Sequence, residues 1–315
     1  MKQYLLGADG GGSKTAFLLA DIEGNPIATC TRGRSNPGDI GYEAMEALIL
    51  EGFSYLCREN GVEEREVVSV FAGVAGLTSF KMNELLRAAM EKTFPCAHCD
   101  CSHDGMNVLY GAFPGGEDGA IVICGTGSSC FANAKDSVYR IGGYGQFDLT
   151  GNGYEIGKAA FAHVFRTLDG RDAYGVLAAR LDEKFPGGCH KSIFDINSYT
   201  KTQFATFAPL VFDAAREGDP AAMAILEQNF AYIGELITTA ANLFDGKPYS
   251  VALAGGIFKD PLSMEMVQKH VPAHATLFRL DKEPVLGAVA KAKHQYVANQ
   301  EATPISSFLK NSPSR

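Results

Sequence analysis

A glycine-rich segment near the N-terminus has the composition of an anion-binding loop. Residues 9–15 read DGGGSKT, with three successive glycines directly after an aspartate. Glycines let backbone N–H groups close round an anion, and a carboxylate beside phosphates suits a hydrated Mg²⁺ ion. A Walker loop or a dinucleotide fingerprint must open a helix, whereas the next residues, 16–21 (AFLLAD), read as a strand. We therefore expect a strand–turn–strand phosphate loop with Asp9 at a strand end; the alternative is a plain glycine hairpin.

Two more glycine segments could complete a nucleotide site. Residues 124–129 (CGTGSS) lie between two predicted strands, where the hydroxyls of Thr126 and Ser128 can donate hydrogen bonds to phosphate. Residues 254–258 (AGGIF) follow a predicted strand and precede a helix, and glycines there let a flat ring such as adenine approach the backbone. Each segment alone is a weak signal. The two phosphate loops together are a strong one, because each joins the first two strands of a repeated pattern.

Asp104 is the candidate for proton transfer. It follows a predicted strand at 97–103 and begins a predicted helix. A carboxylate at a strand end can accept the proton of a substrate hydroxyl. Asp is also a common N-cap, and the two roles can coexist.

The cysteines and histidines just before Asp104 raise the question of a metal site. Cys96, Cys99 and Cys101 are interleaved with His98 and His103. A zinc site would need a second CxxC or HxxxH pair to complete a tetrahedron, and the sequence offers none at a suitable spacing. We expect a buried strand in which the cysteines serve as small apolar residues.

The elements that must position these residues occur in the same order twice. The first series consists of strands near 3–9, 16–21 and 26–31, a helix at 42–60, a strand at 67–72, a helix at 80–93, a strand at 97–103 and a helix at 105–113. A Gly- and Pro-rich segment at 114–119 then marks a boundary. The second series consists of strands at 120–124, 129–134 and 137–141, a helix at 220–244 with Asp219 as N-cap and Pro220 at its first position, a strand at 249–254, a helix at 262–270, a strand at 275–279 and a helix at 284–297.

This repeat of architecture predicts an α/β protein of two domains, residues 1–117 and 118–299, with a cleft between them for a ligand. The last helix could pack back on the first domain. Residues 300–315 are rich in Ser and Pro, so we expect a poorly ordered tail there.

The charge of the chain restricts its partners. Its 315 residues include 28 Lys and Arg against 36 Asp and Glu, a formal net charge of −8. This balance argues against nucleic acid or an anionic membrane surface as the main partner, so a nucleotide would have to be bound locally. The sequence has neither a signal peptide nor a run of about 18 apolar residues, and a cytoplasmic location is the expectation.

In this order and spacing, DGGGSKT, CGTGSS and AGGIF resemble the sugar kinase/Hsp70/actin superfamily. Within it the chain resembles the N-acetylglucosamine kinase and BadF-type ATPase family over about residues 3–295. Further marks of the resemblance are SNP at 35–37, AGVAG at 72–76, HDG at 103–105 and GGYG at 142–145. The resemblance implies two facing ribonuclease H-like domains of the actin/hexokinase type with a nucleotide cleft between them. It also implies ATP and Mg²⁺ as cofactors and an amino sugar, N-acetylglucosamine or glucosamine, phosphorylated on its 6-hydroxyl.

The resemblance implies roles for individual residues as well. Asp104 would be the general base, and Asp9 would hold Mg²⁺ through water. The nucleotide would contact Gly11, Gly12, Ser13, Thr15, Thr126, Gly127, Ser128, Gly255 and Gly256. The sugar would contact Asn36, Gly143, Tyr144, Gly145 and Asp148. Dimers are common among similar kinases, so a homodimer is one expectation.

One segment departs from the family pattern. Where relatives usually read LGDEGSGYxIG, residues 147–157 read FDLTGNGYEIG, so that Leu149 and Thr150 replace an acidic pair that helps to bind the sugar. Asp148 could substitute if the loop is one residue shorter. The alternative function is that of a BadF-type ATPase acting on a protein partner, such as a dehydratase activator that shares an iron–sulfur cluster between subunits.

Overall fold

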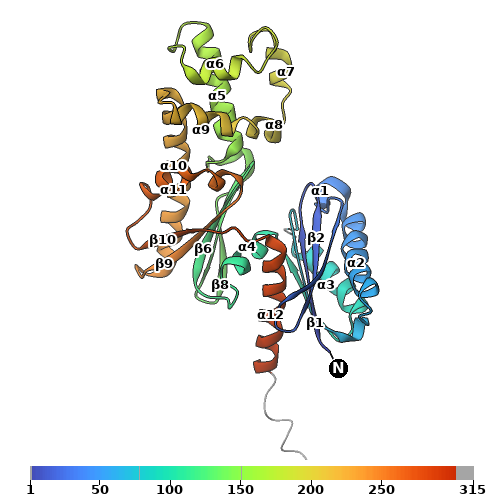
Figure 1. Ribbon diagram of the computed structural model, residues 1–315. Coiled ribbons are helices and arrows are strands. Elements are labelled where there is room, and N and C mark those ends of the chain that lie inside the picture. The colour runs from blue at the N-terminus through green and yellow to red at the C-terminus, as the bar shows by residue number, and fades with distance from the viewer. Residues whose placement is uncertain (1, 78, 150, 303–315) are drawn as a thin grey trace, which may run out of the picture. The chain divides into compact units, whose positions relative to one another are not determined.

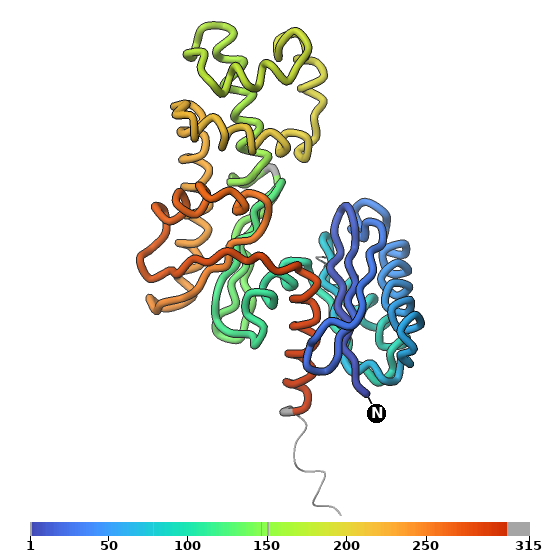
Figure 2. The backbone as a smooth tube through the Cα atoms, in the orientation of Figure 1, coloured from blue at the N-terminus to red at the C-terminus, as the bar shows by residue number. Residues whose placement is uncertain are grey.

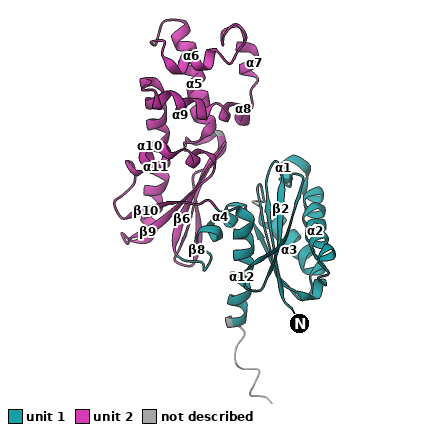
Figure 3. Cartoon of the chain, in the orientation of Figure 1, with its two compact units in different colours: residues 1–117, 282–315 teal, residues 118–281 magenta. Residues whose placement is uncertain are grey.

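The computed structural model describes residues 2–77, 79–149 and 151–302. Two compact units make up this part of the chain (Figure 3): unit 1 holds the described residues up to 117 and from 282 onward, and unit 2 holds residues 118–281. Each unit is an α/β structure built on a mixed sheet of five strands.

Unit 1 has the strand order β3-β2-β1-β4-β5, with β1–β3 antiparallel and β4 and β5 parallel to β1. Its strands are β1 (Tyr4–Gly10), β2 (Thr15–Asp21), β3 (Pro26–Arg32), β4 (Val67–Val74) and β5 (His98–Ser102). Its helices are α1 (Pro37–Ile40), α2 (Tyr42–Glu59), the short 3-10 helix η1 (Glu64–Glu66), α3 (Phe80–Thr93), α4 (Gly105–Ala112) and α12 (Pro284–Ala302).

Helices cover both faces of this sheet, with α2 and α3 on one side and α12 on the other (Figure 1). The side chains of β1 alternate accordingly, because successive residues of a strand point to opposite faces. Leu6 lies in the core with Phe53 of α2, whereas Leu5 packs with Ala288 and Val289 of α12. A sheet that is buried on both faces explains why its inner strands read as nearly unbroken apolar runs.

Unit 2 repeats this topology with the order β10-β9-β6-β7-β8. Its strands are β6 (Gly119–Cys124), β7 (Ser128–Ala134), β8 (Ser137–Ile141), β9 (Tyr249–Ala254) and β10 (Ala275–Arg279). Its helices are η2 (Gly145–Phe147), α5 (Gly153–Leu168), α6 (Val176–Asp182), α7 (Ile193–Asn197), α8 (Lys201–Ala205), α9 (Ala208–Arg216), α10 (Pro220–Ala241), η3 (Asn242–Phe244), η4 (Gly256–Lys259) and α11 (Pro261–Gln268). Helices α5 to α9 cluster beyond one end of the sheet (Figures 1 and 2).

The predicted elements are confirmed to within a residue or two, apart from the ends of two helices. The helix predicted at 220–244 is α10 as far as Ala241, and the 3-10 helix η3 covers its last three residues. Asp219 caps α10 as predicted, since its carboxylate accepts hydrogen bonds of 2.9 Å from the N–H groups of Ala221 and Ala222. Helix α12 continues through residues 300–302, which were expected in the tail, and the rest of the predicted tail lies outside the described residues. None of the helices that the structure describes is long and apolar enough to span a membrane.

Candidate functional site

The DGGGSKT segment forms the predicted strand–turn–strand loop. Strands β1 and β2 pair in register as far as Gly10 opposite Thr15, and residues 11–14 close the hairpin with a 3.0 Å hydrogen bond from the Gly11 N–H to the Lys14 carbonyl. Gly12 and Ser13 are exposed at the tip. Their backbone and hydroxyl groups are therefore accessible to an anion.

The rest of unit 1 holds this loop rigidly. The Ala75 N–H donates to the Gly10 carbonyl at 2.7 Å, and the Ser35 N–H donates to the Gly11 carbonyl at 3.0 Å. A side chain at Gly10 would overlap the Ser35 hydroxyl, so glycine serves close packing here. Thr15 was predicted to bind phosphate, but it is fully buried and its hydroxyl donates to the Gly33 carbonyl at 2.8 Å. A phosphate contact would require that bond to break, so in this conformation Thr15 supports the loop.

Asp9 lies at the carboxyl end of β1 and is held by a residue that the sequence analysis missed. The Asn107 amide, fully buried in α4, donates at 2.7 Å to the Asp9 carboxylate and at 3.1 Å to the Gly73 carbonyl. A side chain on Gly73 would overlap this amide. In the sequence, Asn107 could have been noticed as the single side-chain amide in the otherwise apolar helix at 105–112 (GMNVLYGA).

The environment of Asp9 favours a cation. Burial raises the pKa of its carboxyl from 3.8 to about 6; the nearby charge of Asp104 adds to the rise, while the Asn107 hydrogen bond and Lys14 oppose it. A divalent ion would offset the cost of this partly buried charge. Mg²⁺ typically takes one or two carboxylates together with water and phosphate oxygens, and this donor set fits it.

Asp104 begins α4 but does not use its side chain as a cap. Its carboxylate lies 2.8 Å from Nδ1 of His103 and is about one-third exposed. Asp104 is thus placed at the carboxyl end of β5 with an imidazole beside it, and its charge is close enough to influence Asp9. The Asp104 carboxylate makes no N-cap hydrogen bond to α4, so helix capping, the alternative role considered for this residue, does not occupy it.

Asn36 has part of its side chain committed to the fold. Its Oδ1 accepts a 2.9 Å hydrogen bond from the Gly38 N–H and caps α1. Gly76 leaves room for the carboxamide, since a side chain there would overlap it. A substrate could therefore use the amide nitrogen of Asn36, because the oxygen is engaged.

The CGTGSS segment of unit 2 forms the equivalent loop. Residues 125–127 join β6 to β7 and are closed by a 2.8 Å hydrogen bond from the Gly125 N–H to the Gly127 carbonyl. The first N–H groups of α5 also bond to this loop: Gly153 donates to the Gly125 carbonyl at 2.8 Å and Tyr154 donates to the Thr126 carbonyl at 3.2 Å. Thr126 and Gly127 are left exposed at the tip.

A cavity of about 600 Å³ lies next to this loop in unit 2. Its lining is mostly apolar and comes from η4, α8 and α9 together with the loop: Gly125, Thr126, Gly153, Thr202, Ala205, Thr206, Ala208, Pro209, Phe212, Gly256, Ile257, Lys259, Asp260 and Pro261. Size and lining suit a nucleoside. Gly256 faces open space there, whereas Gly255 turns the chain at φ 104° where a side chain would overlap the Cys124 carbonyl.

A second cavity, of about 120 Å³, adjoins the same loop. It is lined by Thr126, Gly127, Ser128, Gly143, Gly145, Asn152, Tyr154, Glu155 and Lys201. It thus brings the predicted phosphate residues of unit 2 together with two predicted sugar residues. Asn152 and Glu155 shape its wall. Asn152 caps α5, with the Glu155 N–H donating to Asn152 Oδ1 at 3.0 Å, and the two side chains are joined by a bond from Asn152 Nδ2 to Glu155 Oε1 at 2.8 Å.

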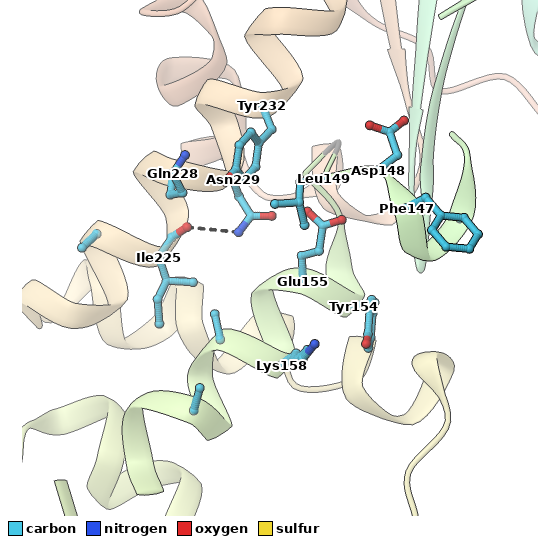
Figure 4. Close-up of a pocket in the computed structure, with 14 residues that line it drawn as sticks. Phe147, Asp148, Leu149, Tyr154, Glu155, Lys158, Ile225, Gln228, Asn229 and Tyr232 are labelled. Carbon is cyan, nitrogen blue, oxygen red and sulfur yellow. Dashed lines mark hydrogen bonds between the residues drawn. The ribbon is translucent and has the colours of Figure 1, made fainter. Parts of the chain in front are cut away.

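Gly145 and Asp148 also line a groove of about 800 Å³ between α5 and α10 (Figure 4). Asn152 is fixed to α10, because its backbone N–H donates to Asn229 Oδ1 at 3.1 Å. Leu149, at the position where the acidic pair was missing, points into this groove. Thr150 lies outside the described residues.

Tyr144 stands at the surface of this loop and is 63% exposed. The Arg140 guanidinium lies 5.7 Å from the centre of the Tyr144 ring, and the backbone N–H of Tyr144 donates to Asp148 Oδ2 at 3.4 Å. Of the predicted sugar residues in unit 2, Gly143 and Gly145 face the small cavity, and Gly145 and Asp148 face the groove.

The cysteine cluster is divided by the fold. Cys99 and Cys101 are buried in β5, and burial raises the pKa of each thiol to about 12, whereas Cys96 is exposed in the preceding turn. Within the described ranges, no three His, Cys, Asp or Glu side chains are grouped to hold a metal ion. The interpretation of the cysteines as buried strand residues is confirmed for Cys99 and Cys101 and is wrong for Cys96.

Two units with one strand order, each with a glycine loop between its first two strands, define an α/β protein in which one architecture is repeated. The chain belongs to the BadF/BadG/BcrA/BcrD ATPase family, which it matches over residues 6–292.

Among curated proteins, it is 26% identical to the N-acetyl-D-glucosamine kinase of Dictyostelium discoideum, over 92% of this chain and 98% of that one. It is also 26% identical to a glucosamine kinase of Vibrio cholerae, over 73% of this chain and 78% of that one. Among solved structures, a Chromobacterium violaceum protein assigned as an N-acetylglucosamine kinase matches with a TM-score of 0.69 and 26% identity, covering 91% of this chain and 98% of that one. A glucokinase of the ROK family from Streptomyces griseus, with a TM-score of 0.58 and 18% identity over 92% of this chain and 98% of that one, shares the fold.

Proposed function

We propose that this protein is an ATP-dependent kinase that phosphorylates the 6-hydroxyl of an amino sugar, N-acetylglucosamine or glucosamine. The observation that carries the proposal is the pair of adjoining cavities in unit 2, which share Thr126 of a phosphate loop. Membership of an ATPase family and the names of the curated relatives support it.

In this proposal the two glycine loops hold the phosphates. Gly11, Gly12 and Ser13 would donate from unit 1, and Thr126, Gly127 and Ser128 from unit 2, while the nucleoside occupies the cavity beside Gly256. Asp9, oriented by Asn107, would hold Mg²⁺ through water. The ion would supply positive charge that neutralises the phosphate oxygens.

The sugar would be held by Asn36 and by the loop that carries Gly143, Tyr144, Gly145 and Asp148. Asp104 would accept the proton of the sugar 6-hydroxyl while the oxygen of that hydroxyl bonds to the γ-phosphorus of ATP. The bond from that phosphorus to the bridging oxygen of ADP breaks, and ADP leaves. Catalysis of this kind rests on positioning and charge stabilisation.

An ADP-release assay with Mg-ATP tests the proposal. The sugars to compare are N-acetylglucosamine, glucosamine, N-acetylmannosamine, glucose and N-acetylmuramic acid, with a reaction lacking sugar as the control. We expect release that depends on one amino sugar, with a 6-phosphate as the product by NMR. ADP release that is absent, or the same with and without every sugar, would refute it.

Sugar-independent release would favour the alternative of an ATPase that acts on a protein partner. An iron–sulfur protein of that kind would be brown and oxygen-sensitive when purified. A homodimer and a cytoplasmic location stay predictions from the sequence.

A further inference from the structure

Helix α8 contributes to both cavities of unit 2. Thr202 and Ala205 line the larger one, and Lys201 lines the smaller one beside Thr126–Ser128. A nucleotide whose base lies in the first cavity and whose phosphates lie on the loop would follow this helix. We propose that Lys201 is a further nucleotide-binding residue, whose ammonium group contacts the diphosphate. The inference rests on the proposed nucleotide site.

Glycines of α5 bring α8 into place. A side chain at Gly157 would overlap the Phe204 carbonyl, and one at Gly153 would crowd Ala205 as well as the Gly125 carbonyl. The backbones of the two helices therefore approach closely only because both positions lack a side chain. This gives a physical reason for the glycines of GNGYEIG that the sequence alone did not provide.

The start of α8 is fixed as well. Thr200 caps it, with the Gln203 N–H donating to the Thr200 hydroxyl at 3.3 Å and the Thr200 N–H donating to Gln203 Oε1 at 2.8 Å. The ring of Phe204 packs edge-on against Tyr154 of α5, with their centres 6.0 Å apart. Lys201 thus extends from a backbone that is held on both sides.

The charge around Lys201 suits an anion. Among the described residues that line the small cavity, Lys201 carries the only positive charge. Glu155 lines it too, and its carboxylate is held in place by hydrogen bonds from the Gly151 N–H at 3.0 Å and from Asn152 Nδ2. No carboxylate in the part of the chain that the structure describes forms an ion pair with Lys201. In a protein with a net charge of −8, a local cation favours the binding of polyphosphate.

Lys158 provides a matched comparison. The ammonium groups of Lys201 and Lys158 lie 5.2 Å and 5.7 Å from the centre of the same Tyr154 ring, and both side chains are exposed. Lys158, however, lines the large groove between α5 and α10 (Figure 4) and not the phosphate cavity. The two lysines share residue type and aromatic neighbour but differ in the cavity that they line.

The test compares Lys201→Met, Lys201→Arg and Lys158→Met by titration of ADP and adenosine without any sugar. A charge-assisted hydrogen bond is worth enough for Lys201→Met to weaken ADP binding about 10-fold or more. Adenosine affinity should be unchanged, and the dependence of ADP affinity on salt should decrease. Lys201→Arg should retain most of the affinity for ADP, and Lys158→Met should match the wild type.

Equal ADP affinity in the wild type and Lys201→Met would overturn the inference. So would a parallel loss of adenosine binding, because Lys201 would then act through the position of α8 rather than through phosphate. If the wild type itself binds no ADP, the proposed nucleotide site fails, and this inference fails with it. If ADP binds but no sugar is phosphorylated, only the proposed kinase activity fails.

Discussion

Replacing Asp9 with Asn should stabilise the protein and at the same time abolish its proposed activity. Burial raises the pKa of the Asp9 carboxyl from 3.8 to about 6, so the folded state binds this proton more tightly than the unfolded chain does. Ionisation of Asp9 then costs the folded state about 3 kcal/mol above pH 6, and this cost disappears below about pH 4. An Asn side chain keeps an oxygen for the Asn107 amide but carries no charge.

Urea unfolding of wild type and Asp9→Asn between pH 4.5 and pH 8 measures the effect. Without nucleotide, the gain in the free energy of unfolding should grow with pH and level off above pH 6–7, at up to about 3 kcal/mol. Asp39→Asn is the control, because Asp39 is an exposed carboxylate of α1 in the same unit. If Asp9→Asn proved no more stable than the wild type at pH 8, or if Asp39→Asn gave the same gain, the reasoning from desolvation would be refuted.

Three further predictions concern the proposed reaction. Asp104→Asn should bind ADP as the wild type does and lose about 10²–10⁴-fold in kcat; an unchanged kcat would exclude Asp104 as the general base. Gly157→Ala should weaken ADP and adenosine binding alike, measured by titration, because a methyl group there would displace Phe204 of α8; wild-type affinities would contradict the close contact. Asp148→Asn should raise the KM for the sugar without changing the KM for ATP, whereas equal changes in both would remove Asp148 from the sugar site.

The sequence was sufficient to predict the strands of both sheets, most helices of unit 1 and both loops, because these depend on local patterns. It did not predict the helices α5 to α9. Alternation places Leu5 and Leu6 on opposite faces of β1, and a glycine run between two strands can form little other than a tight turn. The repeat of architecture followed from the order of the elements along the chain, whereas the strand order within each sheet came from the structure. None of the correctly predicted features requires knowledge of which side chains meet across long sequence separations.

The residues that the sequence analysis missed are those defined by long-range contacts. Asn107 matters because its amide meets the carboxylate of Asp9, and the two residues are far apart in sequence. Thr15 is adjacent to the loop, yet its hydroxyl bonds to the Gly33 carbonyl. Lys201 belongs to a segment without any recognisable motif, and only the packing of α8 on α5 reveals the cavity that it lines.

The two loops have the same position in the same topology, yet their surroundings differ in charge. In unit 1 the loop lies beside the carboxylate of Asp9, and this negative charge favours a metal ion. Helix α4 directly follows β5 and brings the Asn107 amide into hydrogen-bonding contact with this carboxylate. In unit 2 the helices α5 to α9 follow the equivalent of β3, and α8 brings the ammonium group of Lys201 to the loop. The inserted helices thus give the second loop an adjoining cavity and a lysine that comes from a helix, whereas Lys14 of unit 1 belongs to the loop itself. The difference between the loops therefore arises from the helices that were inserted into the repeated fold. For this reason variants of Asp9 and Lys201 should affect different steps. Changes at Asp9 should alter the charge that holds the metal ion, and changes at Lys201 should alter the affinity for the diphosphate.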